Sequence, residues 1–183
     1  KTVNTHFTDS TGKNRTVRYR VPNKNQCKEC HASGNSIVPI GPKPRNLDKD
    51  FDYPDQRMNQ LVKWSQMNII DDYPQNVQPV ADFTDPSKDI EARARAYLAI
   101  NCGHCHSPKG SASSTGLYLN YGEKRPKQLG ILKPPVAAGR GSGGLKYSVV
   151  PGDPDASILL FRMISDDPAI MMPESGRSII HQE

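Results

Sequence analysis

The 183-residue chain lacks long hydrophobic runs, and its longest apolar stretches are only a few residues, such as 158–161. Hydrophobic residues make up 35% of the chain and the mean hydropathy is −0.67, whereas a bilayer-spanning helix needs ~20 apolar residues. The sequence therefore predicts no membrane span. It also starts at Lys1 with neither an initiator Met nor an apolar targeting segment, so we expect a mature form or fragment of an exported protein.

The chain also lacks segregated charge. Its net charge is +5 and its pI is near 9.0, but the basic residues are scattered among acidic ones and aromatic residues are only 7%. Nucleic-acid binders usually carry a concentrated basic patch. The glycine-rich stretch 139–144 lacks the Gly-Lys-Ser/Thr ending of a phosphate loop. Nucleic acid and nucleotide partners are thus disfavoured.

Cysteine is scarce, and all four cysteines lie in two copies of one pattern, CKECH at 27–31 and CGHCH at 102–106. Two Cys-x-x-Cys pairs are compatible with a four-thiolate zinc site, with a pair of redox dithiols or with two c-type haem attachments. A histidine follows each pair at once, although the chain has only 5. Haem requires that histidine, while zinc does not.

The separation of the pairs also favours haem. Cysteine pairs of one zinc site usually lie ~15–20 residues apart, but 71 residues separate these two pairs. We therefore predict two covalently attached c-type haems. The thioether cysteines are Cys27, Cys30, Cys102 and Cys105, and the proximal iron ligands are His31 and His106.

Haem attachment would consume every thiol, so no disulfide is expected. Covalent c-type haem is attached outside the bacterial cytoplasm, as is general for such cytochromes. We therefore expect a periplasmic, extracellular or cell-surface location.

Local signals predict three segments. Residues 1–21 form an irregular arm that ends in a strand over 16–21, where apolar residues alternate. Residues 22–80 form a first cytochrome c-like lobe, with helices over 25–32 and 55–70. Residues 81–183 form a second such lobe.

The second lobe has the clearest helix starts. Asp85 with Pro86, and Asp153 with Pro154, each combine an N-cap residue with a first-turn proline. The first of these helices leads into the second motif, and a long loop over 107–152 follows it. The predicted fold class is mostly α, with two small helical lobes, long irregular loops and little β structure.

The sixth iron ligand decides whether a haem carries electrons or reacts with small molecules. For the second haem we predict Met172, which precedes Pro173 in a loop, with Met171 as its alternative. A methionine that merely fills a core gap is the alternative reading.

The first haem has weaker candidates for its sixth ligand. Met58 lies on the apolar face of the helix expected over 55–70, Met67 lies off that face, and His6 lies in the arm. An ordinary core methionine or an exposed histidine explains each of them better than an iron ligand does.

Longer stretches around the motifs resemble an uncharacterised family of bacterial secreted proteins with two c-type haem motifs. The stretches are VPNKNQCKECH, IGPKPRNL, ARARAYL with NCGHCH, KPPVAAGRGSGG and VPGDPDAS. The resemblance covers roughly residues 15 to 183. It implies secretion and haem, without a defined reaction, and members extend further at both ends.

These observations predict a di-haem c-type cytochrome that carries electrons between redox partner proteins. Self-association into a polymeric extracellular conduit is an extension of this hypothesis. The alternative is a peroxidase-like di-haem enzyme with an open axial site on the first haem. A zinc-stapled binding module is a third hypothesis.

Overall fold

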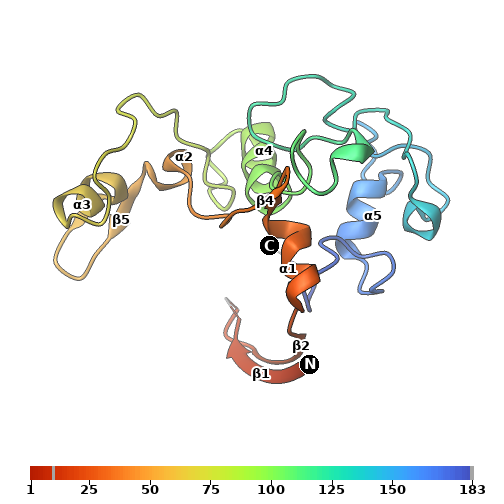
Figure 1. The fold of residues 1–183 in the computed structure, drawn as a ribbon, viewed down its shortest axis with the longest axis horizontal. Helices are drawn as coiled ribbons and strands as arrows, with labels where there is room; N and C mark the ends of the chain where they lie inside the picture. The colour runs from red at the N-terminus through yellow and green to blue at the C-terminus, as the bar shows by residue number, and fades with distance from the viewer. Residues whose placement is uncertain (10, 182–183) are drawn as a thin grey trace. The chain divides into compact units, whose positions relative to one another are not determined.

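Short helices and two-stranded sheets are interspersed along the chain in the computed structural model, which describes residues 1–9 and 11–181 (Figure 1). Helices account for 25% of the residues and strands for 15%. The mostly helical fold of two cytochrome c-like lobes is therefore wrong. The physical reason lies in the 16 prolines and 14 glycines, which interrupt helical hydrogen bonding and favour turns.

The N-terminal arm is a β-hairpin rather than an irregular segment with one strand. Strands β1 (Thr2–Thr8) and β2 (Asn14–Arg20) pair antiparallel, from Thr2 opposite Arg20 to Thr8 opposite Asn14. Almost all of its side chains are exposed, and Val17 is buried. The hairpin is thus stabilised mainly by backbone pairing and by its turn.

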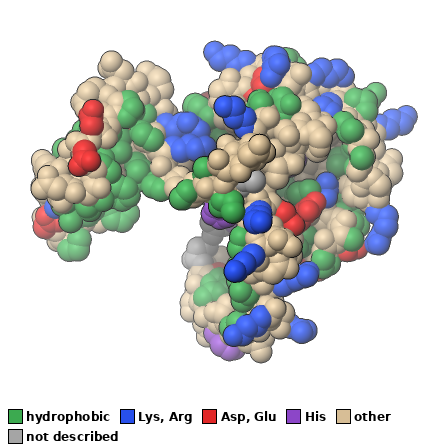
Figure 2. Space-filling model, in the orientation of Figure 1, with side chains coloured by type: hydrophobic (Ala, Val, Ile, Leu, Met, Phe, Trp, Pro, Cys, Tyr) green, Lys and Arg blue, Asp and Glu red, His purple; other side chains and the backbone are tan. Residues whose placement is uncertain are grey.

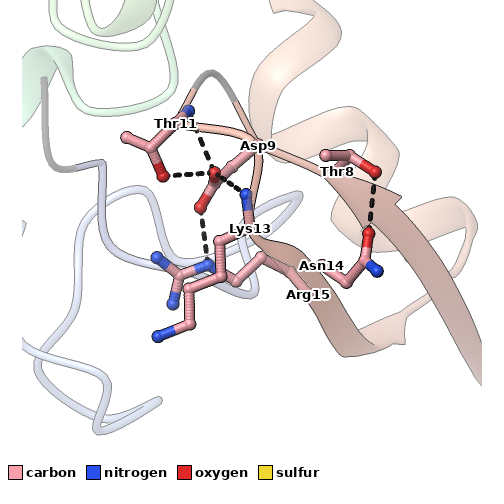
Figure 3. Close-up of polar contacts among 6 residues, drawn as sticks. All are labelled: Thr8, Asp9, Thr11, Lys13, Asn14 and Arg15. Atoms are coloured by element: carbon pink, nitrogen blue, oxygen red, sulfur yellow. Dashed lines mark hydrogen bonds and ion pairs between the residues drawn. The ribbon is translucent and has the colours of Figure 1, made fainter.

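Asp9 organises that turn (Figure 3). Its carboxylate accepts hydrogen bonds from the backbone and hydroxyl of Thr11, from the Lys13 backbone and from Arg15 Nε at 2.7 Å. Donors that favour the charged form, the Thr11 hydroxyl first and Arg15 second, hold the pKa of Asp9 well below its usual range. The turn therefore keeps its geometry at neutral pH.

The chain divides into two compact units. The motif unit comprises Lys1–Val38 and Leu98–Glu183, and the inserted unit comprises Pro39–Tyr97. Both Cys-x-x-Cys-His patterns belong to the motif unit. The boundaries expected after residues 21 and 80 stay predictions.

In the inserted unit, a small sheet leads directly into a helix. The elements, in chain order, are α2 (Pro44–Leu47), β5 (Asp50–Asp52), β6 (Arg57–Asn59) and α3 (Gln60–Gln66). Asn59 begins α3 by accepting hydrogen bonds from the backbone of Leu61 and Val62. Its preference for capping explains why the helix expected over 55–70 is shorter and starts later.

In the motif unit, helices alternate with long loops. Its elements are α1 (Lys24–His31), β3 (Ala32–Ser33), β4 (Ser36–Ile37), the end of α4 (Ile90–Asn101), the 3₁₀ helices η1 (Ser113–Thr115) and η2 (Gly139–Ser142), and α5 (Ile158–Ile164). Ala99, Leu119 and Ile158 are buried. In the described part of the chain, no helix combines the length and apolarity needed to cross a membrane.

Charged side chains are spread out. Figure 2 shows Lys and Arg side chains dispersed over the visible face, and hydrophobic side chains gathered over the region of α3 and β5. Several cations are paired with carboxylates, such as Arg140 Nη2 with Asp167 Oδ2 at 3.0 Å. Such exposed pairs contribute little to stability, roughly 0–1 kcal/mol each.

Candidate metal and cofactor site

Helix α1 presents the first motif. The Asn23 side chain caps its start by accepting hydrogen bonds from the backbone of Asn25 and Gln26, both at 3.0 Å. Cys27, Cys30 and His31 follow within the helix, none of whose residues is buried. The helix expected over 25–32 is present with bounds one residue earlier.

His31 is held by Val38, the residue that follows strand β4. Its Nδ1 atom lies 3.1 Å from the Val38 carbonyl oxygen, and the Val38 backbone N–H donates to the His31 carbonyl at 2.7 Å. A carbonyl only accepts, so Nδ1 carries the proton. Nε2 is then the atom with a lone pair for a metal, as in histidine ligands oriented by a backbone carbonyl.

The second motif continues the hydrogen bonding of α4. Cys102 N–H donates to Leu98 O at 2.9 Å, and His106 N–H donates to Cys102 O at 2.9 Å. Gly110 then brings the chain back over the motif, where its missing Cβ leaves room for the carbonyls of His104 and Cys105. This turn fixes the backbone from which the sulfur atoms and imidazole of the motif project.

A cavity of about 660 Å³ lies beside the second motif. Cys102, Cys105 and His106 line it, and so do Met163 and Met172. Leu119, Ile158 and Leu159 make part of its wall apolar. Cofactor sites are typically mostly apolar clefts of ~300–1,000 Å³. The predicted ligand Met172 is thus brought to the same cavity as His106, and Met171 lines a different cavity of about 180 Å³.

The surroundings of His106 favour its neutral form. Burial lowers the pKa of His106, and the positive charges of Arg162 and His104 lower it further, while a backbone contact with Leu117 acts in the opposite direction. Its Nδ1 atom is buried without a hydrogen bond of standard geometry. A neutral imidazole retains the lone pair that a metal requires.

The two motifs meet, although 71 residues separate their cysteine pairs. Ligand atoms of Cys30, His104 and Cys105 all lie within 4.8 Å of one another. The Cys105 Sγ atom also donates to the Glu29 carbonyl oxygen at 3.4 Å. The sequence pattern identified each cysteine but did not predict this contact.

The remaining distal candidates belong to other elements of the chain. His6 is exposed in β1, and its Nδ1 atom lies 2.9 Å from Thr16 Oγ1. Met58 lies in β6 and the exposed Met67 ends α3, both in the inserted unit. A role for any of them at the first haem stays a prediction.

Two contributors to the site are not among the residues predicted from the sequence. His104 belongs to the three-residue cluster, and Arg162 lines the cavity from α5. His104 lies inside the second motif, where it is badly placed to reach the far side of the same haem, and its proximity to Cys30 is a long-range contact. No local signal distinguished Arg162, since its position depends on tertiary packing.

The thiols give a prediction for the haem-free chain. Burial first, and the neighbouring Cys105 second, raise the pKa of both Cys30 and Cys102 from 9.0 to about 11. Because the thiolate is the nucleophile, alkylation of these residues by iodoacetamide should increase about tenfold per pH unit up to about pH 11. Timed alkylation with a chelator present, read by peptide mass spectrometry, measures this, and rates that level off near pH 9 would contradict it.

Comparison with known proteins identifies no relative. No family model, no curated protein and no solved structure matches the chain. The function therefore has to be argued from its own residues.

The residues fit a c-type haem at the second motif. Two sulfur atoms and a neutral imidazole border one largely apolar cavity of suitable volume. At the first motif, only Glu29 and Cys30 border this cavity, while His31 has the orientation expected of a ligand.

Proposed function

We propose that this chain is a c-type cytochrome with two covalently attached haems, which carries electrons between redox partner proteins. The observation that carries the proposal is the cavity shared by Cys102, Cys105, His106 and Met172. This set contains both attachment sulfurs, the proximal histidine and a methionine of the kind found opposite it in cytochromes c.

Each residue has a distinct role in this proposal. Cys102 and Cys105 anchor the haem through thioether bonds, and His106, kept neutral by burial, binds the iron. The haem supplies reversible one-electron chemistry. The apolar wall formed by residues such as Leu119 and Ile158 limits the access of water.

Helix α5 holds the loop of Met172 in place. The Met172 N–H donates to the Arg162 carbonyl at 3.0 Å, and Arg162 Nε donates to the Ile170 carbonyl at 2.7 Å. Arg162 is also 3.8 Å from a Glu174 carboxylate oxygen. These contacts on both sides of Met172 support its role as the distal ligand of the second iron.

The contact between the motifs supports an internal relay. Ligand atoms of Cys30 and Cys105 lie within 4.8 Å, so the attachment points of the two haems are neighbours. Covalent haem also implies export, so the proposed location is the periplasm or cell surface. Assembly of many copies into an extracellular conduit extends the proposal, and light scattering at high protein concentration tests it, since monomers alone would contradict it.

The alternative is a di-haem enzyme whose first haem has an open axial site. It is favoured by the state of one distal candidate, because the His6 Nδ1 atom already lies within hydrogen-bond distance, 2.9 Å, of Thr16 Oγ1. An open site would admit peroxide or another small molecule while the second haem supplies electrons.

Electron paramagnetic resonance separates carrier from enzyme. The oxidised carrier should show two low-spin iron centres in equal amounts, because both irons have two strong axial ligands. One high-spin centre would instead indicate an enzyme with an open site at the first haem. Integrating both signals against total haem at low temperature makes the measurement quantitative.

A further inference from the structure

The contact between the motifs is a three-residue cluster with the chemistry of a metal site. Sulfur from Cys30 and Cys105 and a ring nitrogen of His104 lie within 4.8 Å of one another. Zinc bound at ~2.3 Å to sulfur and ~2.0–2.1 Å to nitrogen in a tetrahedron separates its ligand atoms by about 3.5–3.8 Å. The 4.8 Å limit is about 1 Å above these separations.

The sulfur and nitrogen ligand atoms of the cluster indicate which metal it would bind. Thiolates and imidazole suit zinc, while calcium and magnesium require oxygen ligands. Three protein ligands leave a fourth tetrahedral position for water. Neither Cys30 nor Cys105 forms a disulfide, so both sulfurs can bind a metal as thiolates.

Other contacts hold the cluster together without a metal. Glu29 accepts hydrogen bonds from the hydroxyl of Ser111 at its carbonyl and from the hydroxyl of Ser175 at its carboxylate, the latter at 3.2 Å. Gly34 N–H donates to the Lys109 carbonyl at 3.1 Å. The end of α1 is thus joined to the segment after the second motif, and the Cys105 Sγ atom also donates to the Glu29 carbonyl oxygen, so Cys30 and Cys105 are held near each other without a metal.

We propose that the haem-free chain binds one zinc ion through Cys30, His104 and Cys105. Binding displaces the two thiol protons and joins the first motif to the second. Bound zinc also keeps one sulfur of each motif from forming a disulfide before haem is attached. Haem attachment then competes with zinc for the same two sulfurs. The site differs from a four-thiolate site because Cys27 and Cys102 are outside it.

The test uses the reduced full chain, produced in a compartment without haem attachment and titrated with Co²⁺ and Zn²⁺. We expect one metal per chain and a thiolate-to-cobalt charge-transfer band. Cys30→Ser and His104→Ala should each weaken binding by more than about 100-fold, since even outer-shell partners contribute 10–100-fold. His181→Ala is the matched control for loss of an imidazole, and circular dichroism checks the fold of each variant.

Absorption spectroscopy at the zinc edge gives a readout that needs no variant. Two sulfur ligands and one nitrogen ligand support the proposal, and four sulfur ligands overturn it. Absence of binding, or an equal loss of affinity in Cys27→Ser and Cys102→Ser, also overturns it. Haem content is measured separately on exported protein, so haem without zinc refutes only the zinc site, and zinc without haem refutes only the proposed cytochrome.

Discussion

The exported chain is expected to carry two covalently bound haems, and the double variant Cys102→Ala/Cys105→Ala is expected to carry one. In the proposal these two sulfurs form the only covalent bonds between the chain and the porphyrin of the second haem. Both cysteines border the cavity that would receive that haem. Without them that haem is lost on denaturation. Haem content per chain, from the pyridine haemochrome spectrum and the mass of the denatured protein, gives the count.

The matched variant is Cys27→Ala/Cys30→Ala, which should also retain one haem, attached at the second motif. A wild-type protein that loses its colour on denaturation would contradict covalent attachment. A double variant that still carries two haems would show that the motifs are not the anchors. Either result would remove the basis of the proposed function.

Gly110→Ala is expected to destabilise the folded chain severely. A Cβ at this buried position would lie 2.6 Å from the His104 carbonyl oxygen and even closer to that of Cys105. Both are backbone atoms of the second motif, so relief requires the main chain to move. Overpacking typically costs about 1–3 kcal/mol. With two backbone oxygens this close we expect the upper end, about 3 kcal/mol, and for a chain of this size a fall in Tm of about 6–12 °C.

Gly122→Ala is the control for this substitution. Gly122 is exposed, and its added Cβ would meet no heavy atom within 4 Å. We expect the free energy of unfolding to change by no more than about 0.5 kcal/mol. Denaturant unfolding of the haem-free chain gives both values, and equal stability of the two variants would show that Gly110 does not pack as described.

Local signals predicted the helices that carry the motifs. The residues at which these helices begin were predicted less well. Asp85 with Pro86 indicated a helix, yet Asp85 accepts from Ser87 in a preceding turn. The helix begins later, at Ile90, and Asp89 accepts from the Ala92 backbone instead. Two aspartates compete as caps within five residues, and the tertiary structure decides between them.

The β structure and the meeting of the motifs could not be predicted in the same way. The hairpin needs cross-strand partners, and the arm was assigned one strand because only 16–21 showed clear alternation. The cluster of Cys30, His104 and Cys105 joins residues far apart in sequence. Periodicity and capping describe neighbours along the chain, so long-range contacts lie beyond them.

The insertion of Pro39–Tyr97 between the two parts of the motif unit sets an order of events during synthesis. The segment Lys1–Val38 is synthesised before the other part of the motif unit, which begins at Leu98. Helix α1 can therefore pack only after the second motif has been synthesised. The delay costs little equilibrium stability, since each doubling of a loop adds only about 0.6 kcal/mol. Its effect is on timing, because the first motif is synthesised before the second, and under the proposed function it would be available for haem attachment before the second motif is.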